Sequence, residues 1–123
     1  MRRWNYKSDF TLKLTPKQVS GEQGASLSDC DFDLIFTCGG RSYTCSRRGE
    51  VYINCEMSDD GTITCVFNEH GLLTGTIRLE SVVYNPNGLF PDGSQKEVTP
   101  QSTDIQLVAC MGDEATEFEI EMI

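Results

Sequence analysis

Apolar side chains occupy every second position from Cys30 to Cys38, and this run constrains the fold more than any other part of the sequence. A period of two over this length is typical of a strand with one buried face. Gly39-Gly40 follows immediately and predicts a two-residue hairpin turn into a second strand. Counting outward from that turn sets the register. The expected pairs are Cys38–Arg41, Phe36–Tyr43 and Leu34–Cys45.

A second hairpin is expected at Asp59-Asp60-Gly61, where Gly61 supplies the left-handed residue of a three-residue loop. A two-residue loop would pair Met57 with Thr64 and spoil the match of apolar residues. The three-residue loop gives the expected pairs Met57–Ile63, Cys55–Cys65 and Ile53–Phe67. Directly opposed residues have Cβ atoms ~4.5–5.5 Å apart, so Cys55 and Cys65 form a candidate facing thiol pair. We expect this pair to stay reduced in a reducing compartment.

The remaining segments are also dominated by strand and turn signals. Strands are expected over residues 9–15, 50–57, 75–84, 103–109 and 116–122, and loops over 19–28 and 85–102. Residues 68–71 are interpreted as a bridge of about one helical turn. Turn signals recur at sandwich-like spacing, and no helical period appears. The sequence therefore predicts an all-β fold, an Ig-like antiparallel β-sandwich of about seven to eight strands. Residues 1–123 are expected to form a single domain, with residues 1–8 flexible.

Net charge and hydropathy disfavour two classes of partner. A formal net charge of −9 disfavours nucleic acid, because phosphate binding needs clustered Lys and Arg. No segment approaches the ~20 apolar residues that span a membrane, so no membrane association is expected. The basic start lacks the apolar stretch of a secretory signal. Residence in the cytosol, or export by another route, is therefore expected.

Charge is unevenly distributed along the chain. Five of the ten basic residues lie in the first 17 positions, and six acids and no base follow from Asp104 onward. Two solvated faces would explain this pattern. A sharper interpretation makes the first and last strands neighbours, with Lys13 facing Glu117 or Glu119. Exposed pairs contribute only ~0–1 kcal/mol, so the pattern is a hint about topology.

Few residues offer catalytic or metal chemistry. The six cysteines include no C-x-x-C pair, and the single histidine cannot complete a zinc set. His70 is a candidate base for Cys65, but a ring that caps neighbouring backbone is the favoured interpretation. Asp29, Asp31 and Asp33 lack the glycine and the final acid of a calcium loop, and a solvated face is favoured for them. We therefore expect no catalytic residue, no metal site and no cofactor.

The long loop expected over residues 85–102 is the candidate binding element. Loops beyond ~12–15 residues in compact domains are usually functional or mobile. Either the loop presents an exposed Leu-Phe tip as a protein-docking anchor, or the tip folds back over the open end of the sandwich. The candidate partner-binding residues are Tyr84, Asn87, Leu89, Phe90 and Asp92. Trp4 and Tyr6 are a second candidate anchor, with core positions as the alternative.

Several segments together suggest a family. The arrangement over residues 51–80 is a strand, an acidic-Gly turn, a strand that ends in Val66-Phe67, a bridge, and a strand that opens at Gly75. Further likeness lies in Trp4-Asn5-Tyr6, Asp9-Phe10, Asp31-Phe32-Asp33, Tyr84, Leu89-Phe90-Pro91-Asp92-Gly93 and Thr99-Pro100. The chain resembles the N-terminal Ig-like domains of phage baseplate and tail-fibre-type proteins, especially those of Bacteroides phages and prophages.

That resemblance implies a non-enzymatic structural or attachment module that acts through protein–protein docking. The implied partners are other tail or baseplate proteins, or further copies of the chain, and the implied location is the virion or the host cytoplasm during assembly. In that family the domain typically leads into fibre segments. The alternative is a bacterial surface or carbohydrate-binding module, which would need exposed aromatic platforms. An enzyme is the least favoured class because the chain has a single His and no paired-acid signal.

Overall fold

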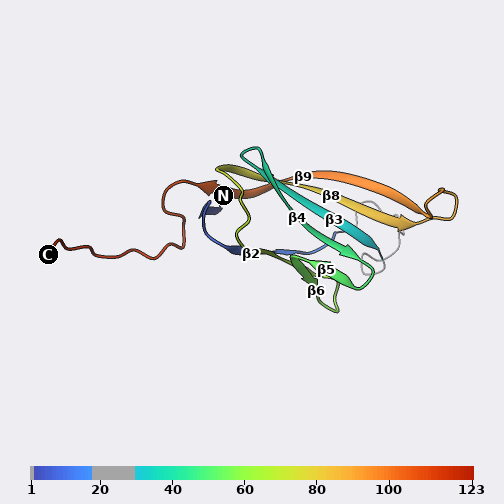
Figure 1. The fold of residues 1–123 in the computed structure, drawn as a ribbon, viewed down its shortest axis with the longest axis horizontal. Helices are drawn as coiled ribbons and strands as arrows, with labels where there is room; N and C mark the ends of the chain where they lie inside the picture. The colour runs from blue at the N-terminus through green and yellow to red at the C-terminus, as the bar shows by residue number, and fades with distance from the viewer. Residues whose placement is uncertain (1, 18–29) are drawn as a thin grey trace.

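All regular structure in residues 2–17 and 30–123, the residues that the computed structural model describes, is β-strand. These strands are β1 (Arg2–Asn5), β2 (Phe10–Leu14), β3 (Asp31–Cys38), β4 (Arg41–Arg48), β5 (Val51–Ile53), β6 (Cys55–Met57), β7 (Ile63–Phe67), β8 (Gly75–Pro86) and β9 (Ser94–Val108). They form a six-stranded sheet in the order β1-β9-β8-β3-β4-β5 and a three-stranded sheet in the order β2-β7-β6 (Figure 1). The all-β prediction is confirmed. In the described ranges no helix is long and apolar enough to cross a membrane.

Two details of the predicted architecture need correction. The described residues contain nine strands, one more than the upper bound of the prediction. The pairing is also not wholly antiparallel, since β1 lies parallel to β9, with Arg2 opposite Ile105 and Asn5 opposite Val108. β1 falls within the residues for which flexibility is expected. The expected loop over residues 19–28 lies outside the described residues.

The hairpin at Gly39-Gly40 has the predicted register. Cys38 pairs with Arg41, Phe36 with Tyr43 and Leu34 with Cys45. Both glycines have positive φ, +62° and +81°, as a tight turn that follows the right-handed twist of its strands requires. Every second residue of β3, from Phe32 to Cys38, is buried, as the alternation predicts.

The second hairpin confirms two of its three predicted pairs. Cys55 lies opposite Cys65 and Met57 opposite Ile63, but Ile53 pairs with Ser46 and not with Phe67. The predicted strand over residues 50–57 is broken at Asn54, which has a φ of 59°. β5 stays in the large sheet and β6 enters the small one. Asn54 connects the two sheets, because its Nδ2 donates to Thr44 O at 3.0 Å and its O accepts from Val66 N at 2.8 Å.

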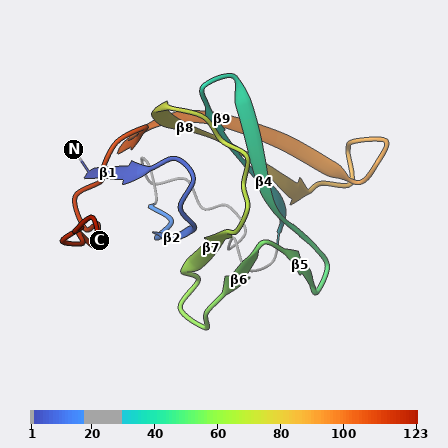
Figure 2. The same cartoon turned by 60° about the vertical axis from the view of Figure 1, so that its left-hand side comes forward.

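The prediction of a loop over residues 85–102 is wrong for most of that range. β8 runs to Pro86 and β9 begins at Ser94, so the two strands form a long hairpin whose far end projects beyond the sheets (Figure 2). Most of β9 before Thr103 is exposed, so no apolar alternation marks it in the sequence. Pro100 is tolerated opposite Glu80 because β9 is paired on one side only at this point. The strand expected over residues 103–109 is the last part of β9.

Three further predictions are wrong. Residues 68–71 contain no helical turn and run as irregular chain between the two sheets. Residues 116–122 form no strand and belong to an exposed tail. Lys13 does not face this tail, because it lies opposite Thr64 in the small sheet. The first and last strands are nevertheless neighbours, and the ion pairs that link the two chain ends are Arg2–Asp104 at 4.0 Å and Arg3–Asp113 at 3.0 Å.

One hydrophobic cluster joins the inner faces of the two sheets. Its members come from β3, β4, β8 and β9 of the large sheet, from β7 of the small one, and from Leu72 between them. Aromatic rings fill its centre. Phe67 stacks on Phe10 with ring centroids 4.5 Å apart, and it meets the edge of Phe36 at 4.8 Å and the ring of Tyr43 at 5.0 Å. The alternating patterns thus bury their apolar faces against one another, which provides the main driving force for folding.

Candidate partner-binding site

The tip of the β8–β9 hairpin is held by its own hydrogen bonds. Asn87 N donates to Gly93 O at 2.9 Å and Gly93 N donates to Phe90 O at 2.9 Å. The Asn87 side chain accepts from Leu89 N at 3.0 Å, and the Asp92 side chain accepts from Ser94 N at 3.3 Å. Such side-chain turns are the usual role of Asn and Asp in loops. The tip is therefore a pair of defined turns.

Leu89 is the most prominent apolar group at this tip. Its side chain is 92% exposed, and the neighbouring Phe90 is 41% exposed. The alternative in which both residues fold back over the open end of the two sheets is wrong, because the tip projects away from them (Figures 1 and 2). Asn87, Leu89, Phe90 and Asp92 are therefore brought together as predicted, at the end of a two-stranded arm.

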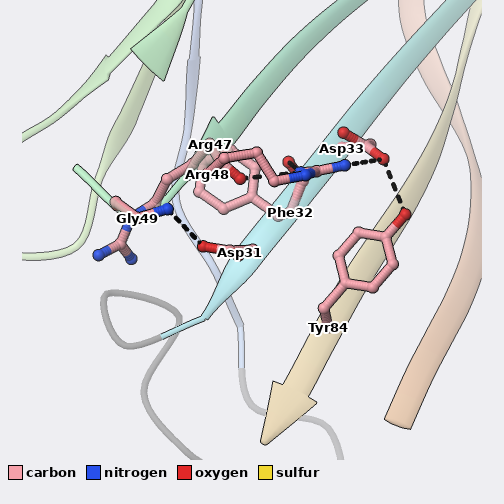
Figure 3. Close-up of polar contacts among 7 residues, drawn as sticks. All are labelled: Asp31, Phe32, Asp33, Arg47, Arg48, Gly49 and Tyr84. Atoms are coloured by element: carbon pink, nitrogen blue, oxygen red, sulfur yellow. Dashed lines mark hydrogen bonds and ion pairs between the residues drawn. The ribbon is translucent and has the colours of Figure 1, made fainter. Parts of the chain in front are cut away.

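Tyr84 does not belong to this tip. It lies in β8 opposite Lys96, and its hydroxyl donates to Asp33 Oδ2 at 2.9 Å. The same oxygen accepts from Arg48 Nη2 at 3.0 Å, and the Arg48 guanidinium lies 4.9 Å from the centre of the Tyr84 ring. Figure 3 shows the three side chains meeting across β3, β4 and β8. Tyr84 therefore holds the base of the β8–β9 arm to β3.

The hydrogen bond to Asp33 affects both of its partners. It raises the pKa of the Arg48 guanidinium and, together with burial, raises the pKa of the Tyr84 hydroxyl. A carboxylate that accepts two such bonds is best satisfied when both donors keep their protons. Arg48 also donates to Phe32 O at 3.2 Å and to Arg47 O at 2.8 Å. The Arg48 guanidinium and the Tyr84 hydroxyl therefore keep the protons that they donate to Asp33.

A second contact extends this cluster toward the β4–β5 turn. Gly49 N donates to Asp31 Oδ1 at 2.8 Å, and Arg47 Nε donates to Gly49 O at 2.7 Å (Figure 3). Asp31 and Asp33 thus do not form the solvated face that the alternation suggests. The two carboxylates bind the turn and the base of the arm to β3. The contacts of Asp31 with Gly49 and of Asp33 with Arg48 lie across the β3–β4 hairpin, whose register the sequence predicts. Tyr84 becomes a neighbour of Asp33 only through the β3–β8 pairing, which the sequence does not reveal.

The predicted facing thiols form part of a group of three. Val66 N donates to Asn54 O, which makes Asn54/Val66 a hydrogen-bonded pair and Cys55/Cys65 the neighbouring non-hydrogen-bonded pair. Side chains are closest at such positions, with Cα atoms about 4.5 Å apart. The Cys45 thiol also contacts Cys65, and this hydrogen bond together with burial raises the pKa of Cys65. No disulfide joins any two of the six cysteines, all of which lie in the described residues, and their redox state in solution stays a prediction.

Native thiol labelling tests the reduced state. Cys110 is exposed, whereas burial raises the pKa of Cys55 to about 11 and four other cysteines are buried. Only the thiolate reacts, so we expect one thiol per chain to react quickly with a disulfide reagent at pH 8. All six should react after denaturation without reductant. Fewer than six would contradict the reduced pair, and loss of the fast thiol in Cys110→Ser is the control.

His70 serves the backbone with both ring nitrogens. Leu72 N donates to its Nδ1 at 3.0 Å, so its Nε2 carries the hydrogen and donates to Ser8 O at 3.1 Å. The ring is buried and meets the rings of Phe10 and Tyr43 edge-on. The predicted capping role is confirmed. A ring with both nitrogens engaged has no free site from which to act as a base toward Cys65.

Replacement of His70 by alanine is expected to lower the free energy of unfolding by about 2–4 kcal/mol, because a buried amide loses its acceptor and the ring leaves a cavity. His70→Asn is the matched variant. Its side-chain oxygen can still accept from the amide two residues on, so part of the loss should be recovered. Urea denaturation followed by circular dichroism measures both. Equal losses would show that ring packing alone matters.

The described aromatic residues do not form a shared platform for a sugar ring. Tyr43 packs against the core and donates its hydroxyl to Val66 O at 2.9 Å, and Trp4 donates its indole NH to Asp9 O at 3.3 Å. Tyr6 also packs against the core. Tyr52 and Phe90 are more exposed but lie on β5 and on the hairpin tip. No specific feature of the described surface therefore favours the carbohydrate-binding alternative.

Comparison with protein-family models, with curated proteins and with solved structures finds no match for this chain. The resemblance to phage baseplate and tail-fibre-type domains thus rests on the sequence features alone.

Proposed function

We propose that this chain is a non-enzymatic attachment module of a phage or prophage tail, of the baseplate or fibre type, built as an Ig-like β-sandwich in one domain. It docks other tail or baseplate proteins through the tip of the β8–β9 hairpin, in the virion or in the host cytoplasm during assembly. The two sheets that share one core support the sandwich assignment. The single observation that carries the docking role is the tip, which holds Leu89 92% exposed on defined turns.

Preorganisation of the tip favours binding. A partner that binds a flexible loop must pay the entropy of ordering it, whereas a tip held by its own hydrogen bonds is already ordered. Asn87 and Asp92 fix the turns, and the Asp33–Arg48–Tyr84 cluster holds the base of the arm to the large sheet. An exposed Leu at the end of such an arm can enter a pocket of a partner as a central anchor, and a few such residues usually dominate binding.

Incorporation into particles tests the proposal. Mass spectrometry of purified particles from the bacterium that carries the gene should detect the chain. Leu89→Asp should reduce its amount in particles by tenfold or more, because a charge in an apolar pocket is strongly unfavourable. The melting temperature should change by less than about 2 °C, since Leu89 makes no core contact.

Val51→Asp is the matched control, because Val51 is also an exposed aliphatic residue and lies on β5, in a different part of the fold. Its incorporation should equal that of the unaltered chain. Absence of the chain from particles would reject the attachment role. Equal loss in both variants would reject the tip as the docking element.

A further inference from the structure

The two sheets leave a groove between their edges at the start of the chain. It has a volume of about 650 Å³ and lies between β1 and β2, with Trp4, Phe10, Leu12 and Ile105 among its lining residues. Among the described residues β2 pairs only with β7, so one edge of β2 is left unpaired, whereas the outer edge of β1 is bonded to Asp113. The sequence pattern does not reveal this groove, because the groove depends on which strands lie at the sheet edges.

The core beside β2 is incompletely covered. The inward residues of β7, among them Cys65 and Phe67, are fully buried, whereas the inward residues of β2, among them Leu12 and Leu14, are only partly buried. Because Val66 N donates to Asn54 of β6, the odd-numbered residues of β7 bond to β2. The backbone groups of Thr11 and Lys13 therefore point to the free edge of β2. A strand could be added there.

The C-terminal tail has the pattern of a strand without a sheet. Phe118, Ile120 and Met122 are 79%, 93% and 98% exposed, and they alternate with Glu117, Glu119 and Glu121. The tail extends away from both sheets (Figure 1). Alternation of this kind is stable only when one face is buried and the backbone is paired.

We propose that residues 116–123 of one copy add to β2 of a second copy as an extra strand that closes the groove. The apolar face of the tail would cover Phe10 and Leu12, and its acids would face outward beside Lys13. Charge favours this pairing. The first 17 residues carry five bases and one acid, while the tail after Gly112 carries five acids and no base. Strand addition to a free sheet edge is an established mode of recognition.

The start of the tail directs it to another copy. Cys110 O accepts from Asn5 Nδ2, and Asp113 N donates to Arg3 O at 3.0 Å, so the chain runs along β1 in the reverse direction. The Arg3–Asp113 ion pair holds it there. Asp113 and Glu114 line the groove on the β1 side, and the tail beyond them extends away from both sheets (Figure 1). The tail therefore does not fill the groove of its own copy.

The consequence is head-to-tail assembly. Tail and groove are different surfaces, so each copy would donate one strand and accept one, and such a contact can repeat without closing. The hairpin tip takes no part in it. The inference therefore goes beyond docking through the tip, and each can fail without the other.

Light scattering coupled to size-exclusion chromatography tests the inference on the full chain. We expect a series of multimers that grows with concentration. Phe118→Ser with Ile120→Ser should give a monomer with an unchanged melting temperature. The matched control, Val51→Ser with Leu89→Ser, removes two other exposed apolar side chains elsewhere and should keep the multimers. The proposal would be overturned if the full chain stays monomeric up to about 1 mM, the concentration at which weak contacts form. It would also be overturned if the control variant dissociates into monomers.

Hydrogen exchange by NMR locates the contact. The monomeric double variant should show fast exchange at the Thr11 and Lys13 amides. Addition of a peptide with the sequence of residues 114–123 should slow both at least tenfold, whereas a peptide with the same residues in scrambled order should not. Lys13→Glu should weaken peptide binding, and Glu119→Lys in the peptide should restore it.

Protection of the tail amides in a monomeric full chain would place the tail in the groove of its own copy and would overturn the proposal. A monomer that still enters particles would overturn this inference alone.

Discussion

Replacement of Phe67 by alanine is expected to lower the free energy of unfolding by about 3–5 kcal/mol, the typical cost of removing a fully buried aromatic ring. Phe67 is fully buried and contacts Phe10, Phe36 and Tyr43 with centroid distances of 4.5–5.0 Å. These partners lie on β2, β3 and β4 and so belong to both sheets. The ring is therefore the main link between the sheets, and its loss leaves a cavity that β-strands fixed by pairing cannot close.

Equilibrium urea denaturation measures this effect, and Val66→Ala is the matched control. Val66 is the neighbouring residue on β7 and its side chain points outward, so its loss should cost less than about 1 kcal/mol. Small domains are stable by only about 5–15 kcal/mol, so this loss is a large fraction of the total free energy of unfolding. A loss for Phe67→Ala as small as that of the control would show that the two sheets do not depend on this ring.

The two short hairpins could be predicted from the sequence because turn chemistry and alternation agree there. Gly39-Gly40 permits the positive φ that the turn needs, and any other register of β3 would move its apolar residues to the solvent face. The loop before Thr62 has a glycine, Gly61, at the one position with positive φ. Local rules suffice where a strand and its partner are joined by a few residues.

The change of sheet at Asn54 could not be predicted by the same reasoning. Alternation continues through it, so residues 50–57 have the pattern of one strand. Asn tolerates the left-handed region better than most residues, and this was the only local signal of a break. The cost of the conformation is offset by bonds to Thr44 and Val66, which come from different sheets. Those partners are determined by the tertiary arrangement.

The predictions for the β8–β9 arm and for the C-terminal tail were wrong for opposite reasons. Most of β9 is polar on both faces and contains Pro100, so its strand depends on pairing with β8 and not on burial. The tail has the alternating pattern but no strand beside it. In the candidate site, the turn residues Asn87 and Asp92 could be recognised from their types. The role of Tyr84 could not, because its partner Asp33 becomes a neighbour only through the β3–β8 register.

Replacement of Gly39 by alanine is expected to cost about 2–5 kcal/mol, and Gly40→Ala only about 1–2 kcal/mol. Both residues have positive φ, so both variants bear the backbone strain of an L-residue there. A Cβ on Gly39 would lie 2.5 Å from Leu73 Cβ and 2.8 Å from Thr74 O, whereas a Cβ on Gly40 would have no atom within 4 Å. The difference between the two losses therefore measures the contact between the turn and the chain that enters β8.

A double-mutant cycle separates contact from strain. Leu73→Gly removes the nearest clashing atom, so Gly39→Ala should cost less in that background than in the unaltered chain, with a coupling of about 0.5–3 kcal/mol. Part of the loss should remain, because the carbonyl of Thr74 stays in place. The same cycle with Gly40→Ala should give no coupling. Equal coupling of Leu73→Gly with Gly40→Ala and with Gly39→Ala would show that the turn responds as a whole. The close approach at Gly39 would then not explain the larger loss of stability.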